Sequence, residues 1–311
     1  IDIFISLFLL IWIIENFIKN EKFVSLGKID FLFFIYLFYI ILHYIFSKNR
    51  AVAHDEFIRN ILIGGSFFVG RFYSNFKKDI LKYFVITSGI ISLYGIWQNF
   101  GGRIFIFEVP KISPPFATFG NRNFFAGYLI LSYPVSLGLL LEKRNIFYFT
   151  LLLSVLIAGF LTGSRAWAVC FLISTFLFLY SKMKRRNLLV IIFSILALSG
   201  ILKYKNFFLR ETTRVLIWRD TIKMALKNPL IGVGIGEFRI HFPDYAGSDL
   251  KKRYPLDKFI VNFAHNEYIE IFAETGIPGL VIFLLIISFV KFSNPYYLRI
   301  SLISSLIHAF F

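Results

Sequence analysis

The stretch VNFAHNEYIEIFAETGIPGL, residues 261–280, joins a polar cluster to an apolar segment. Its polar residues open a helical pattern that runs on into apolar residues, so we expect His265 at a helix N-terminus, where a water-exposed loop meets a membrane. The dipole of that helix disfavours a charged imidazole and lowers its pKa. A neutral imidazole is a usable general base, although a plain polar residue at a helix start explains the same pattern.

The composition around this stretch is that of a membrane protein. The chain has 311 residues, of which 57% are hydrophobic and 17% are charged, and its mean hydropathy is +0.70. A net charge of +16 suits contact with anionic lipid headgroups or phosphorylated lipids. Nucleic acid is not expected as a partner, because the charge is spread over short loops between apolar segments. The single cysteine, Cys170, excludes an internal disulfide.

Apolar runs of about 20 residues, the length that crosses a bilayer, recur along the chain. They predict an all-α, polytopic integral membrane helical bundle with about ten spans. The expected spans are residues 1–18, 29–46, 57–73, 80–98, 123–141, 145–162, 166–181, 188–203, 277–292 and 296–311. Glycines interrupt the third span. Because Ile1 and Phe311 both lie inside apolar runs, we expect the chain to be a piece of a longer protein.

Lysine and arginine in the short loops predict the orientation of the bundle. Most of them fall in one set of alternate loops, including residues 71–82 and 182–186, which is therefore expected on the cytoplasmic side. The one long loop, about 203–265, is then expected outside. Arg165, in the turn of LTGSRAWAV (161–169), is also placed outside, against the usual charge bias. It is either functional or a side chain that reaches to the interface.

The long loop is predicted to contain an amphipathic helix. Thr212 or Thr213 can cap a helix that ends at Lys227, before Asn228-Pro229. Apolar residues at helical spacing make one face, which we expect on the membrane or over the bundle. The residues of this face are Val215, Trp218, Ile222, Ala225 and Leu226.

Two further loops are expected to be irregular. GVGIGEF, 232–238, predicts a tight turn that brings backbone close to the membrane; a helix and a proline precede it, which disfavours a dinucleotide-binding motif. The loop 99–122 contains prolines that exclude a regular helix. It ends at Asn121 and Asn123, which also fit a simple helix cap.

The sequence lacks the residues that several kinds of catalytic chemistry require. The five histidines are dispersed, and there is no Asp-x-Asp and no His-Glu-x-x-His, so neither a metal nor another cofactor is expected. Glu267, Glu270 and Glu274 share a helix face, which suits a solvated surface or partners for cations better than a glycosidase pair. The remaining candidates are Arg165, Arg214 and His265. Two arginines that grip a diphosphate and a histidine base suit transfer of a group from a lipid-linked pyrophosphate.

Four stretches resemble the O-antigen ligase and O-antigen polymerase superfamily of bacterial membrane glycosyltransferases. The likeness covers roughly 119–311, which predicts an N-terminal group of transmembrane helices at 1–118 and a ligase/polymerase-like membrane domain at 119–311. The stretches are FGNRNFFAGYLILSYP (119–134), LTGSRAWAV (161–169), RVLIWRDTIKMALKNPLIGVGIGEF (214–238) and AHNEYIEIFAETGIPGL (264–280).

The resemblance implies a fold of the GT-C type and metal-independent transfer of a glycan from undecaprenyl pyrophosphate to an acceptor hydroxyl. It implies a multi-pass protein of the bacterial cytoplasmic (inner) membrane with a periplasmic or extracellular active site. His265 would be the base, and Arg165 and Arg214 would hold the diphosphate. The supporting positions would be Asn266, Glu267, Asn121 and Asn123.

The chain departs from the family pattern at two places. Arg122 stands where a proline is common, which leaves the contribution of that loop open. The segment SLIHAFF near the C-terminal end resembles a later histidine-containing span of the family, but an acidic residue often found there is absent. His308 is therefore left out of the expected site.

The acceptor separates the subfunctions: a ligase uses the lipid A core, a polymerase uses another lipid-linked glycan, and a related branch uses protein. The compact motifs favour the ligase. A transporter or flippase for lipid-linked oligosaccharide is the alternative from another class. It predicts charges within the spans and internal repeats, and the sequence shows neither clearly.

Overall fold

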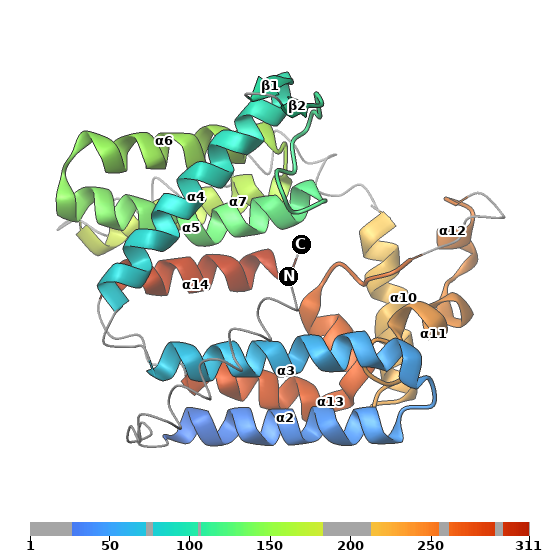
Figure 1. Ribbon diagram of the computed structural model, residues 1–311. Coiled ribbons are helices and arrows are strands. Elements are labelled where there is room, and N and C mark those ends of the chain that lie inside the picture. The colour runs from blue at the N-terminus through green and yellow to red at the C-terminus, as the bar shows by residue number, and fades with distance from the viewer. Residues whose placement is uncertain are drawn as a thin grey trace. The chain divides into compact units, whose positions relative to one another are not determined.

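The computed structural model describes residues 27–72, 77–104, 107–182, 213–254, 261–289 and 295–310. The spans expected at 1–18 and 188–203 lie outside these residues. The chain divides into two compact units, each treated by itself below. Figure 1 shows their elements. This division into units differs from the domain boundary predicted after residue 118. That domain boundary stays a prediction.

The first unit combines helices from the N-terminal part of the chain with helices from residues 211–291. Figure 1 shows α2, α3 and α13 running alongside one another within it, and α2 packs against both of the others. The helices of this unit are α2 (Lys28–Phe46), α3 (Arg50–Phe72), α10 (Thr213–Lys227), α11 (Phe238–Tyr245), α12 (Ser248–Lys251) and α13 (Glu267–Phe289).

The second unit is a helical group with one small sheet. Strands β1 and β2 pair antiparallel, with Arg103 opposite Glu108, and add two short strands to the predicted all-α fold. Its elements are α4 (Lys77–Phe100), β1 (Gly102–Ile104), β2 (Phe107–Val109), α5 (Arg122–Lys143), α6 (Ile146–Leu161), α7 (Arg165–Lys182) and α14 (Tyr296–His308).

Within the described ranges, four helices are long and apolar enough to cross a membrane: α2, α4, α5 and α13. Helices α6 and α7 are apolar but shorter. These helices confirm an all-helical membrane protein in outline, whereas the ten spans and the GT-C arrangement stay predictions. The span predicted at 277–292 belongs to a helix that begins at Glu267.

Helices α2 and α3 are held together by polar contacts at one end and near their middle. Arg71 donates two hydrogen bonds to Asp30, each 2.9 Å long, and this bidentate pair joins the start of α2 to the end of α3. Tyr36 donates to Asn60 at 2.6 Å nearer the other end. The glycines in the third predicted span do not interrupt α3, which is continuous from Arg50 to Phe72.

Helix α10 ends at Lys227, as predicted, and buries a second face that was not predicted, while Ala225 is the buried residue of the predicted face. Leu216, Ile217 and Met224 point into the core shared with α11 and α13, whereas Leu226 is 64% exposed. Asp220 is also buried on this face, where it accepts a hydrogen bond from Gly247 N at 2.9 Å. The helix therefore lies over its own unit, and the predicted apolar stripe is largely on the outside.

The second unit is packed through small and polar side chains between its helices. Gly159 of α6 leaves room for the ring of Trp167 on α7, because a Cβ at this position would collide with the indole. Ser174 of α7 and Ser304 of α14 share a hydrogen bond of 2.6 Å. The irregular loop before α5 was predicted correctly, and buried Gln98 fixes it by accepting from Phe116 N and Ala117 N.

Candidate functional site

His265 lies in the loop that leads into α13, between two anchored neighbours. Asn266, only 3% exposed, caps the helix by accepting from Ile269 N at 3.2 Å. On the other side, Ala264 N donates to the carboxylate of Glu270 at 2.6 Å. His265 itself has a φ of 56°, in the left-handed region that non-glycine residues rarely adopt. The loop thus holds an exposed histidine in an unfavourable backbone conformation, as functional sites often do.

The surroundings of His265 favour a neutral ring. Partial loss of water around the imidazole lowers its pKa, and the positive charge of Arg214 lowers it further. Arg214 lies in the first turn of α10, so the structure brings these two predicted residues within electrostatic range of each other. The direction of this pKa shift agrees with the prediction, and burial and Arg214 are causes that the sequence analysis did not name. The ring is therefore ready to accept a proton near neutral pH.

Helix α13 is broken just after its first two turns, and residues 229–234 fill the break. Gly276 has a φ of 69° inside the helix, which interrupts the usual hydrogen bonding. Val233 N donates to Ala273 O at 2.9 Å, and Ile277 N donates to Pro229 O at 2.8 Å. The backbone groups freed by the break are thus paired again, as a membrane segment requires.

The turn GVGIGEF is tight, as predicted, and its close neighbour is the broken helix. Gly232, Gly234 and Gly236 all have positive φ. A Cβ at Gly232 would collide with the backbone of Glu274, so only glycine fits against α13 here. The glycines serve a close approach between two backbones, one from the long loop and one from α13.

Two carboxylates hold this turn in place. Glu274 accepts from Gly236 N at 2.9 Å and from Phe238 N at 3.1 Å. Glu237, only 2% exposed, accepts from the Ser47 hydroxyl at 2.7 Å and pairs with His241 at 3.1 Å. Burial raises the pKa of Glu237, but its hydrogen bonds outweigh burial and hold that pKa below the usual value.

The three glutamates at the start of α13 have separate surroundings. Glu267 is exposed, whereas Glu270 binds the histidine loop and Glu274 binds the glycine turn. The predicted solvated face is therefore correct only for Glu267. The backbone-binding roles of Glu270 and Glu274 were not predicted from the sequence. The sequence did contain signals for these roles. They are the acidic residues spaced four apart and a glycine turn whose backbone N–H groups need acceptors.

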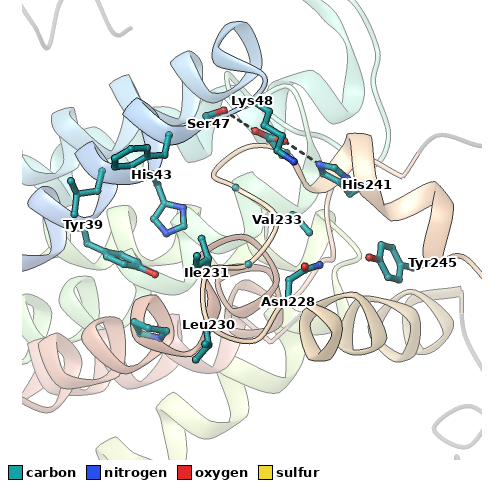
Figure 2. A pocket seen from close by; sticks show the side chains of 16 residues that line it. Tyr39, His43, Ser47, Lys48, Asn228, Leu230, Ile231, Val233, His241 and Tyr245 are labelled. Atoms are coloured by element: carbon teal, nitrogen blue, oxygen red, sulfur yellow. Dashed lines mark hydrogen bonds and ion pairs between the residues drawn. The ribbon is translucent and has the colours of Figure 1, made fainter.

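A pocket of about 630 Å³ lies next to the glycine turn. Figure 2 shows Tyr39 and His43 of α2 on one side of it and His241 and Tyr245 of α11 on the other. Its lining contains neither His265 nor Arg214. The pocket is therefore separate from the pair that carries the predicted chemistry.

The remaining predicted residues lie in the second unit. Arg165 is exposed at the first position of α7. Asn121 caps α5 by accepting from Asn123 N at 2.7 Å, which is the simpler of the two roles considered for it. Because the two units are described separately, the predicted roles of Arg165, Asn121 and Asn123 beside His265 stay predictions.

Residues 149–284 match the family model of O-antigen ligase. The matched range includes the Arg165 turn, α10, the glycine turn and the first part of α13. No curated protein matches the chain. The family implies a lipid-linked glycan and a glycosyltransferase-like activity of the ligase or polymerase kind. This part of the chain therefore supports a relation to the O-antigen ligase and O-antigen polymerase superfamily.

Proposed function

We propose that this protein is an O-antigen ligase-like glycosyltransferase. It moves a glycan from undecaprenyl pyrophosphate to a hydroxyl of the lipid A core, on the outer face of the bacterial cytoplasmic membrane. The observation that carries the proposal is that His265 lies in the loop before α13 with Arg214 within electrostatic range. A histidine kept neutral by partial burial and by a nearby cation suits proton removal from an alcohol, and the cation itself suits a pyrophosphate.

In the proposed step, His265 accepts the proton of the acceptor hydroxyl as its oxygen attacks the anomeric carbon of the donor sugar. A new C–O bond forms, and the bond from that carbon to the pyrophosphate oxygen breaks. Undecaprenyl pyrophosphate leaves with the bonding electron pair. Arg214 and Arg165 bind the diphosphate and stabilise its growing charge, for which a planar guanidinium is well suited.

The supporting residues have defined tasks in this proposal. Asn266 fixes the start of α13 through its cap, and Glu270 fixes the loop on the other side of His265. The glycine turn and Glu274 close the break in α13 behind them. These contacts keep the imidazole in one place, so that little reorganisation is needed during transfer. Glu267 is exposed beside the base and suits contact with the acceptor.

The proposal is tested by transfer assays in proteoliposomes with a glycan linked to undecaprenyl pyrophosphate. EDTA is present throughout, and lipid A core, a second lipid-linked glycan and a protein acceptor are supplied separately. The parent protein and the variants His265→Asn and His54→Asn are compared. His54 lies on α3, where its ring contacts the Tyr44 hydroxyl at 3.3 Å, so its variant controls for loss of a histidine as such.

We expect transfer to lipid A core by the parent and by His54→Asn, and none by His265→Asn. Transfer to another lipid-linked glycan only would identify a polymerase, and transfer to protein would identify the third branch; both outcomes contradict the ligase assignment while keeping the chemistry. Equal transfer by His265→Asn would contradict the base. Movement of lipid-linked glycan across the bilayer without transfer would identify a transporter.

A further inference from the structure

A small cleft of about 160 Å³ lies in the first unit, and the proposed transfer step leaves it without a role. It is lined by residues of α3, the glycine turn, α11, the loop 261–266 and α13. The side chains that matter below are Asp55, Glu56, Arg59, Arg239, Asn262 and Phe263.

The cleft offers both hydrogen-bond donors and hydrogen-bond acceptors. Asp55, Arg239 and Asn262 have no hydrogen-bond or ion-pair partner among the residues that the structure describes. Arg59 pairs with Glu56 at 2.8 Å, and both side chains keep contact with solvent. A carboxylate accepts, a guanidinium donates, and an amide does both. This set matches neighbouring hydroxyl groups, each of which donates and accepts.

An aromatic ring lies at the same cleft. Phe263 is 47% exposed, although it is a large apolar side chain in a loop outside the predicted spans. An exposed ring beside several polar groups is typical of a pocket that binds a ligand with one apolar face and a polar edge. A sugar ring has this character, since its C–H groups form a face and its hydroxyls form the edge.

The cleft is tied to the proposed base through the chain itself. Phe263 precedes His265 by two residues, and Ala264, between them, is bound to Glu270, which also lines the cleft. A ligand in the cleft therefore lies beside the loop whose conformation positions His265. The acceptor, rather than the donor diphosphate, is the substrate that the base must touch.

We propose that this cleft binds the sugar ring of the acceptor that carries the attacking hydroxyl. Phe263 packs on the face of the ring, while Asp55, Arg239 and Asn262 hydrogen-bond to its hydroxyls. The cleft then decides which hydroxyl is presented to His265. This inference rests on the proposed function for its biological meaning, but the binding of a sugar can be tested without any transfer.

The first test separates the affinities for the two substrates. Phe263→Ala should raise the acceptor KM about tenfold, the loss of one well-packed ring contact, and leave the donor KM unchanged. Phe263→Tyr keeps the ring face and should restore the acceptor KM. Phe31→Ala removes an exposed phenylalanine of α2 (65% exposed) and serves as the matched control. An unchanged acceptor KM in Phe263→Ala, or an equal rise in both KM values, would overturn the inference.

The second test needs no donor. Lipid-free oligosaccharides, cut from the acceptors by mild acid, are added to the full chain in detergent, and saturation-transfer NMR measures binding. Binding by the parent that is lost in Arg239→Gln and Phe263→Ala supports the sugar site even if the parent transfers nothing, in which case only the proposed reaction fails. If both variants transfer normally and bind the oligosaccharide as the parent does, the proposed sugar site is contradicted, whereas the proposed reaction is not.

Discussion

Two helix starts in this protein share a capping asparagine but have very different surroundings. Helix α5 begins after Asn121 and α13 begins after Asn266, and each asparagine caps its helix through a backbone N–H. Asn121 and its neighbour Arg122 are exposed, whereas Asn266 is buried. At α13, the residue before the cap is a histidine in the left-handed region, next to a bound carboxylate and within range of an arginine charge. A cap alone starts a helix; the tertiary contacts make the candidate site.

The largest effect is expected at His265. Asparagine tolerates the left-handed region, so His265→Asn keeps the backbone conformation and removes the base. We expect transfer to fall by about a hundred- to ten-thousand-fold, the usual contribution of a general base. The measurement is kcat in proteoliposomes, with thermal unfolding of the purified variant as the check on folding. A variant that keeps kcat would mean that the α13 start, like that of α5, is only a cap.

Glu270 should come next, because it binds the loop rather than the substrate. Glu270→Ala removes the acceptor of the buried Ala264 N–H and should lower kcat about tenfold, since a buried N–H left without an acceptor costs roughly 1–3 kcal/mol. Glu270→Gln keeps an oxygen at the same position and should recover most of kcat. If the two variants were equally impaired with acceptor and donor KM unchanged, the carboxyl group itself rather than this hydrogen bond would be what matters.

Arg214 should change the pH dependence of transfer. Its positive charge disfavours the imidazolium and so lowers the pKa of His265. Transfer needs the neutral ring and is lost as the pH falls through that pKa. The acid limb of the pH–rate profile should therefore have its midpoint below the usual histidine pKa of about 6.5. Arg214→Gln removes the charge and should move the limb to higher pH.

The matched variant for this test is Arg214→Lys, which keeps the charge but lacks the planar fork. It should lower kcat and leave the acid limb where it is in the parent. If the acid limb of the pH–rate profile were the same in Arg214→Gln and the parent, Arg214 would not act on the pKa of His265. Full activity of Arg214→Lys would remove its role on the diphosphate.

The smallest effect is expected at the other helix start. Asn121→Ala removes the cap of α5 and should reduce the free energy of unfolding by about 1 kcal/mol, with kcat and both KM values unchanged. Thermal unfolding and transfer kinetics of the same preparation give both quantities. A large loss of kcat without loss of stability would instead support the role beside the site that the family resemblance implies for Asn121.

Much of the fold could be predicted because the apolar runs and their end signals are local. Helices α2, α4 and α5 match the predicted spans closely, and α10 ends where Asn228-Pro229 stops it. Helix α13 begins at Glu267, beside the polar cluster where a helix start was predicted, and the apolar span predicted at 277–292 is its later part. The break at Gly276 is tolerated only because a distant segment pairs with the freed backbone, and no local pattern contains that information.

The candidate site was predictable in its residues but not in its supports. His265, Arg214 and a helix start beside the histidine follow from sequence motifs, whereas the capping role of Asn266 was not predicted. The tasks of Glu270, Glu274 and Glu237 depend on which N–H groups the folded chain brings to them. The buried face of α10 was not predicted for the same reason: two faces of the helix carry apolar residues, and only packing decides which one is buried.

The most direct test of the central claim is chemical rescue of the base. His265→Gly removes the strain of the left-handed backbone conformation, since glycine adopts that conformation freely. It also leaves space for added imidazole. Transfer by this variant is measured with and without imidazole, and over a range of pH. We predict that the variant alone is inactive, and that imidazole restores transfer with a pH dependence that follows the added base. Transfer by the variant without imidazole, or a pH profile like that of the parent, would contradict the assignment of His265 as the base.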